Sequence, residues 1–108
     1  MSSWKIEYTE DAQNDLRSFD HSVQVLILKN IAKVAQNPLP NTEGGYGKPL
    51  GNTGNTHLSG LLKIKLRSNG IRIVYQLVRT ETAMKVIVIA LRDDNQVYKI
   101  AHTRQKSC

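Results

Sequence analysis

The stretch from Leu62 to Gln76, LKIKLRSNGIRIVYQ, decides the fold, because it holds two alternating runs joined by Asn69-Gly70. Apolar residues alternate with basic or polar ones before this dipeptide and again after it. A type I′ turn needs positive φ at both central positions, so Asn-Gly between two such runs is a strong hairpin signal. The stretch therefore predicts a two-stranded antiparallel hairpin.

The predicted register divides the side chains of this hairpin between two faces. A two-residue loop would place Leu66 opposite Ile73 and Arg67 opposite Arg72, and opposed residues share a face of the sheet. One face is then apolar and suits a core: Leu62, Ile64, Leu66, Ile71, Ile73 and Tyr75. The other face carries cations and no carboxylate: Lys63, Lys65, Arg67 and Arg72. Like charges directly opposite each other are unfavourable, so this face predicts either a bound anion or side chains that splay into water.

Charge and cysteine content limit the classes of protein to consider. The chain has 108 residues and a formal net charge of +6, and one domain is the expectation. Residues 1–54 hold five Lys/Arg and six Asp/Glu, whereas residues 55–108 hold ten and three. Such a basic half fits nucleic acid, an anionic surface or an acidic protein partner. Cys108 is the only cysteine, which excludes an intrachain disulfide and argues against a cysteine zinc site.

The sequence shows neither the pattern of a signal peptide nor that of a membrane span. The start, MSSWKIEYTED, has no basic segment followed by an apolar one, and no apolar run reaches the length of a membrane span. We therefore expect a cytoplasmic protein that does not associate with a membrane.

The sequence outside the hairpin predicts two helices and two further strands. Residues 4–8 alternate, as expected for a strand, and Thr9 is a plausible N-cap for a short helix. Apolar residues between 23 and 35 recur at helical spacing and predict a second helix. Residues 84–91 are almost continuously apolar and β-branched, which is typical of an interior strand covered on both faces.

These elements give the order βααβββ, and residues 96–105 are compatible with a short C-terminal helix. The expected fold class is α+β, with a helical hairpin packed on a small, mainly antiparallel four-stranded sheet. Segment 37–60 is left as a long loop or insertion within a single domain over residues 1–108. Its GGYGK at 44–48 is a weak match to a phosphate-binding loop, because Pro49 stands where Ser or Thr is required.

With the hairpin and the tail both considered, the chain resembles the RelE family of toxins, within the RelE/ParE superfamily of type II toxin–antitoxin systems. The resemblance is carried by LKIKLRSNGIRIVYQLV at 62–78 and VIVIALRDDNQVY at 86–98, and it covers nearly the whole chain except segment 37–60. It implies a microbial-RNase-like fold and an mRNA interferase, an endoribonuclease that enters the ribosomal A site and cuts the codon held there. It also implies no metal and no other cofactor, and a cognate antitoxin bound in a hetero-oligomer.

The resemblance also implies the site residues, position by position. The catalytic residues would be Lys65, Arg72, Arg92 and Tyr98, and the substrate-binding residues Lys63 and Arg67. Cleavage through the neighbouring 2′-OH needs a base, cations on the pentacoordinate phosphate and an acid for the leaving 5′-oxygen.

The roles of these residues follow from their chemistry. Lys65 is the leading base, since nearby cations favour the neutral form that a lysine base requires. Tyr98 is the alternative base, or a ring on which a nucleobase stacks. Arg92 would stabilise the leaving oxygen or relay a proton to it. Lys63 and Arg72 would hold the scissile phosphate.

Other interpretations stay open at this stage. A ParE-like toxin would share the fold and inhibit DNA gyrase without cutting RNA, although such chains generally lack the full set of lysines, arginines and tyrosine. A non-catalytic nucleic-acid-binding module would also explain the charge. A two-histidine ribonuclease would need two of His21, His57 and His102 to meet, and nothing in the sequence brings them together.

Overall fold

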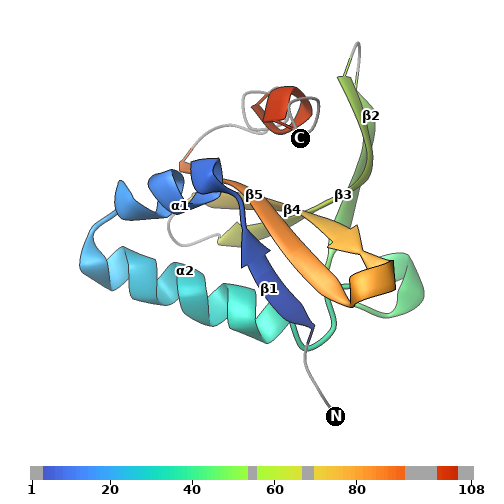
Figure 1. The fold of residues 1–108 in the computed structure, drawn as a ribbon, viewed down its shortest axis with the longest axis horizontal. Coiled ribbons are helices and arrows are strands. Elements are labelled where there is room, and N and C mark those ends of the chain that lie inside the picture. Colours follow the sequence, from blue (N-terminus) through green and yellow to red (C-terminus); the bar gives the residue numbers. More distant parts are fainter. Residues whose placement is uncertain (1–3, 54–55, 67–69, 92–99, 105–108) are drawn as a thin grey trace.

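The computed structural model describes residues 4–53, 56–66, 70–91 and 100–104, which form one sheet with helices on both of its sides (Figure 1). The elements are β1 (Lys5–Tyr8), α1 (Glu10–Arg17), α2 (His21–Val34), the 3-10 helix η1 (Asn41–Glu43), β2 (Lys48–Thr53), β3 (Thr56–Leu66), β4 (Ile71–Val78), the 3-10 helix η2 (Arg79–Glu81) and β5 (Ala83–Leu91). Residues 100–104 form a further short helix, inside the range where a C-terminal helix was expected. In this part of the chain no helix is long and apolar enough to cross a membrane.

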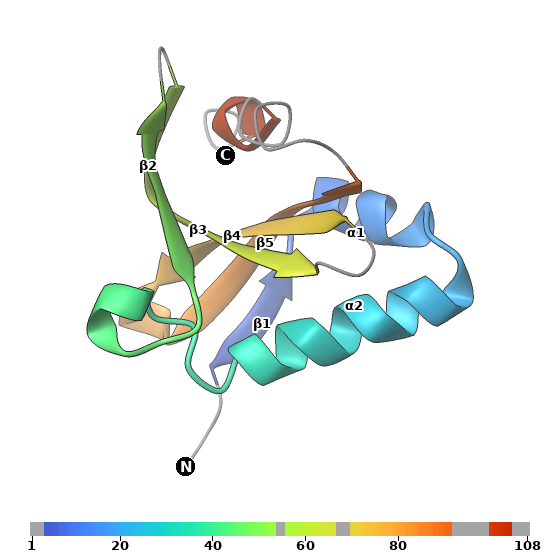
Figure 2. The ribbon, with the colours of Figure 1, turned by 180° about the vertical axis from the view of Figure 1, so that it is seen from behind.

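The five strands lie in the order β1-β5-β4-β3-β2. β1 runs parallel to β5, and the other neighbours are antiparallel. α2 lies along one face of the sheet, and the helix at 100–104 lies over the opposite face (Figures 1 and 2). The predicted α+β class is therefore confirmed, whereas the predicted number of four strands is wrong.

The additional strand comes from segment 37–60, which was predicted to be a long loop or insertion. β2 occupies residues 48–53 of this segment, and β3 already begins at Thr56. The sequence of β2, KPLGNT, contains proline and glycine, which are depleted in strands. As an edge strand paired only with β3, β2 tolerates a proline that an interior strand would reject.

Local sequence explains the two helices. The side chain of Thr9, the predicted N-cap of α1, accepts a hydrogen bond from the backbone N–H of Ala12 at 3.0 Å. On α2, Ile27, Ile31 and Val34 recur at helical spacing and are buried. Each helix therefore presents an apolar stripe to the sheet.

The central hairpin forms with a register different from the predicted one. Leu66 pairs with Ile71 and Lys65 pairs with Arg72, whereas a two-residue loop would have paired Leu66 with Ile73. The predicted opposed pairs are therefore wrong by two residues. The predicted faces of β3 and β4 are nevertheless correct, because the side-chain period of a strand is two. Hydrophobic alternation thus identified the faces but left the loop length undetermined.

Both faces of the inner strands carry buried side chains. The main core lies between the helices and the sheet, and includes Ile27 and Ile31 with Ile73 and Tyr75, all fully buried. A smaller cluster lies on the opposite face and consists of Leu61, Val74, Ile87, Val88 and Ala101. β5 contributes to both clusters, which confirms the predicted strand covered on both faces.

A buried tyrosine holds the segment before β2 against the sheet. The hydroxyl of Tyr75 donates a hydrogen bond of 2.7 Å to the carbonyl of Pro38. Burial raises the pKa of Tyr75 above its usual range. A Cβ added at Gly47 would collide with this hydroxyl and with the side chain of Leu62. Close packing therefore accounts for this glycine of the GGYGK motif.

We expect Tyr75→Phe to lower the free energy of unfolding by about 1–3 kcal/mol, because the buried carbonyl of Pro38 loses its donor. In urea denaturation, this loss would appear as a lower midpoint at an unchanged m-value. Tyr46→Phe is the control, since the side chain of Tyr46 is 55% exposed and should tolerate the change. Equal midpoints for Tyr75→Phe and the wild type would contradict this role of the hydroxyl.

The raised pKa of Tyr75 also predicts sensitivity to alkali. Above pH 10.0, the ordinary tyrosine value, the unfolded chain releases a phenol proton that the folded chain retains. The stability contributed by this group is therefore intact below pH 10 and is lost as the pH rises further. Between pH 9 and 11 the wild type should lose roughly 1 kcal/mol more stability than Tyr75→Phe. Parallel losses in the two proteins would exclude Tyr75 as the titrating group.

Candidate functional site

Four cations of β2, β3 and β4 lie on one face of the sheet as two directly opposed pairs. Lys48 pairs with Lys63 across β2 and β3, and Lys65 pairs with Arg72 across β3 and β4. Lys63 and Lys65 are two positions apart on one strand, so all four share a face. We call them the basic array: Lys48, Lys63, Lys65 and Arg72.

The strands around the basic array supply no compensating charge. β2, β3, β4 and β5 contain neither aspartate nor glutamate. Directly opposed like charges are unfavourable in a sheet, and here two such pairs are adjacent. A polyanion bound across the face would relieve this repulsion, so the array is suited to a phosphate backbone.

The basic array adjoins the small apolar cluster of the same face. Val74 pairs with Val88 and Arg72 pairs with Ala90 along the β4–β5 ladder. Ala101 of the C-terminal helix packs into this cluster and is fully buried. The C-terminal helix is therefore seated beside Arg72 rather than away from the cations.

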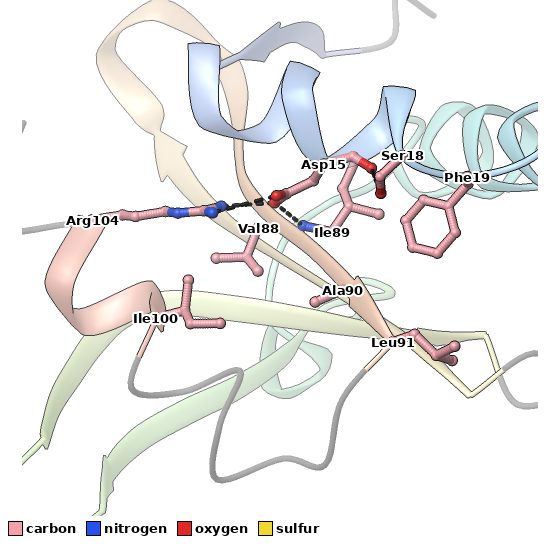
Figure 3. A pocket seen from close by; sticks show the side chains of 9 residues that line it. All are labelled: Asp15, Ser18, Phe19, Val88, Ile89, Ala90, Leu91, Ile100 and Arg104. Atoms are coloured by element: carbon pink, nitrogen blue, oxygen red, sulfur yellow. Dashed lines mark hydrogen bonds and ion pairs between the residues drawn. The ribbon is translucent and has the colours of Figure 1, made fainter.

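An ion pair ties this helix to the far edge of β5 (Figure 3). Arg104 donates from Nη1 to Asp15 Oδ2 at 2.7 Å and to the carbonyl of Ile87 at 2.8 Å. Asp15 Oδ2 also accepts the backbone N–H of Ile89 at 3.0 Å. β1 pairs with β5 only as far as Val86, so these side chains satisfy edge groups that no strand reaches. α1, β5 and the C-terminal helix are thereby joined at one point.

A hollow of about 370 Å³ opens next to this ion pair. Phe19, Ile100 and Leu91 contribute apolar surface to it, and the Asp15–Arg104 pair forms its polar wall (Figure 3). Leu91 ends β5 opposite Ile71, at the same end of the hairpin as the Lys65–Arg72 pair. None of the described residues that line the hollow belongs to β2, β3 or β4, so the basic array is not part of it.

The structure brings together three of the predicted site residues, Lys63, Lys65 and Arg72. The other three, Arg67, Arg92 and Tyr98, lie outside the described residues, so their predicted roles stay predictions. Sequence reasoning missed Lys48, because it fell in a segment predicted as loop and only the pairing of β2 aligns it with Lys63. Within the described ranges, His, Cys, Asp and Glu form no group of three able to hold a metal ion.

The comparisons with known sequences identify relatives along nearly the whole chain. No protein-family model matches it. The chain is 26% identical over 107 residues to a RelE-like toxin protein of Escherichia coli, covering 95% of this chain and 98% of that protein. It is 27% identical over 99 residues to the mRNA interferase toxin RelE of Escherichia coli K12, covering 92% and 94%.

Solved structures show the same fold. A variant of the Escherichia coli toxin RelE in the free state matches with a TM-score of 0.72 at 23% identity, covering 95% of this chain and 98% of that one. A chain of the toxin–antitoxin complex RelBE2 from Mycobacterium tuberculosis matches with a TM-score of 0.68 at 19% identity, covering 87% and 97%. The chain therefore has the small α+β fold of these solved toxin chains. The sequence predicted a resemblance to the RelE family of toxins, and these relatives support that resemblance.

We expect Asp15→Asn to loosen the C-terminal helix, because Arg104 then loses its charged partner. The side chains of Asp15 and Arg104 are only 20% and 22% exposed. The free energy that holds the helix in place should therefore fall by about 1–2 kcal/mol. Faster amide hydrogen exchange across residues 100–104, with core amides of β4 unchanged, would report it.

Asp11→Asn is the matched control for this prediction. Asp11 also faces Arg104, but at 3.7 Å and with a side chain that is 62% exposed. Its removal should therefore change stability by less than about 0.5 kcal/mol. Identical exchange in the two variants would show that Asp15 does not anchor the helix.

Proposed function

We propose that this chain is the toxin of a type II toxin–antitoxin system and an endoribonuclease that cleaves mRNA in the ribosomal A site. The observation that carries the proposal is the direct opposition of Lys65 and Arg72 on a face of the sheet where β2, β3, β4 and β5 contain no carboxylate. Relatives over 92% or more of the chain are named RelE-like toxin and mRNA interferase, and they support this reaction class.

The proposed reaction is attack of the neighbouring 2′-OH on the scissile phosphate. Lys65 takes the proton from the 2′-OH as the general base, and Arg72 holds two phosphate oxygens with its planar guanidinium. The pentacoordinate phosphate gains negative charge as the 2′-oxygen adds, and the cations of the basic array stabilise that charge. Because lysine and arginine supply the positive charge themselves, the proposed mechanism assigns no step to a metal ion.

The residues outside the described part complete the proposal. Arg92 would protonate or stabilise the leaving 5′-oxygen, which breaks its bond to phosphorus as the 2′,3′-cyclic phosphate forms. Tyr98 would act as the alternative base or stack on a nucleobase. Arg67 and Lys63 would hold phosphates beside the scissile one.

The proposed partner is a cognate antitoxin. Two of the structural matches are chains of complexes described as RelBE toxin–antitoxin assemblies, from Mycobacterium tuberculosis and Escherichia coli. A basic face of this kind would be neutralised by an acidic or amphipathic segment, in a hetero-oligomer located in the cytoplasm. If contacts to the basic array dominate, the affinity for the antitoxin should fall as salt is added.

A gyrase-inhibiting toxin and a non-catalytic binding module remain the alternatives. Both are compatible with the fold, but neither needs a lysine base directly opposed to an arginine. The experiment below therefore measures RNA breaks directly.

We expect Lys65→Ala and Arg72→Ala each to slow cleavage of a translated message at least about 100-fold, since each removes a group acting on the transition state. Primer extension on message bound to ribosomes would locate and quantify the breaks. Lys85→Ala is the control, because Lys85 pairs with Gln76 on the same sheet but outside the basic array. Intact message together with inhibited DNA supercoiling would favour the gyrase alternative, and cleavage by both variants within threefold of the wild type would refute the assignment.

A further inference from the structure

A second hollow, of about 310 Å³, opens at the edge of β3 between α2 and the start of β2. It is lined by four lysines from three elements: Lys33, Lys48, Lys63 and Lys65. No acidic side chain is among the described residues that line it. Four lysine side chains around one hollow attract an anion.

The hollow arises from the way β2 joins the sheet. The first pair of the β2–β3 ladder is Lys48 with Lys63, so β2 does not extend along β3 beyond Lys63. Ile64 and Lys65 line the hollow at this uncovered edge. Lys63 and Lys65 belong both to the hollow and to the basic array, so a ligand chain lying on the array could continue into the hollow without a gap.

An aromatic ring is available at the same place. The side chain of Tyr46 lines the hollow and is 55% exposed. The ammonium group of Lys33 lies 5.9 Å from the centre of the Tyr46 ring, which keeps a cation beside an exposed π-face. Nucleobases stack on such rings, and neighbouring lysines then contact the phosphates.

We infer that this hollow is a subsite for single-stranded RNA, which binds a backbone phosphate next to the cleavage position and stacks the adjoining base on Tyr46. The inference rests on the proposed function, because the strand would reach the hollow from the basic array. An acidic peptide is the competing occupant. It is less suited to the hollow, since carboxylate side chains make no use of an exposed ring.

The test measures fluorescence anisotropy of a labelled, uncleavable 2′-O-methyl RNA of about eight nucleotides, at several salt concentrations. The double variant Lys33→Gln/Lys48→Gln should weaken binding about tenfold at low salt. It should also reduce the slope of log affinity against log salt by about 0.7, as expected for the loss of one phosphate contact. Tyr46→Ala should weaken binding at least about fivefold, and Tyr46→Phe should restore it.

Lys29→Gln/Lys85→Gln is the matched control, because it removes two positive charges from α2 and β5 at residues that do not line the hollow. This control should change affinity less than twofold.

Arg72→Ala separates the two proposals. If Arg72→Ala weakens RNA binding and Lys33→Gln/Lys48→Gln does not, the subsite is refuted while the proposed function stands. If neither variant weakens it, the proposed function fails as well. Weaker binding of polyglutamate with unchanged RNA affinity would overturn the inference in favour of an acidic protein ligand.

Discussion

The pairing of β3 with β4 is the constraint on which the rest of the structure depends. Leu66 and Ile71 face the helices and are buried, and the next pair along the ladder, Lys65 and Arg72, must face the other way. The burial of apolar side chains on one face therefore fixes the cations on the other. A register change of one residue would reverse every side chain of the hairpin, and the hydrophobic core prevents it. The core thus maintains the opposition of two cations, Lys65 and Arg72, that neither strand would adopt for its own stability.

The distribution of acidic residues supports this arrangement. Asp15, whose side chain is 20% exposed, lies on α1 and faces the outer edge of β5, where it holds Arg104. The C-terminal helix is therefore anchored by an ion pair on the side of β5 that does not face β4, while Ala101 packs on the cluster beside Arg72. A carboxylate used for anchoring within the basic array would instead neutralise it. Because the carboxylate of Asp15 and the basic array lie on different sides of β5, the array stays cationic. The C-terminal helix is still held next to the array.

The sequence predicted those features that depend on local chemistry or on period two. The faces of the hairpin, the Thr9 cap and the two-sided burial of β5 belong to this group. It could not predict the hairpin register, because alternation is unchanged by a shift of two residues. The Asp15–Arg104 pair was equally inaccessible, since its partners are 89 positions apart. β2 was missed because proline and glycine mask a strand whose pairing depends on the extension of β3 back to Thr56.

The segment around GGYGK shows how a misleading motif can still contribute to a site. Its glycines do not cradle a phosphate: Gly47 lies against the buried hydroxyl of Tyr75, and that hydroxyl also binds the carbonyl of Pro38. These contacts fix the chain immediately before β2, so that Lys48 enters the sheet opposite Lys63. The position of one cation of the basic array therefore depends on a tyrosine of the core. A residue whose role is packing in this way determines how far the cationic surface extends beyond the hairpin that the sequence predicted.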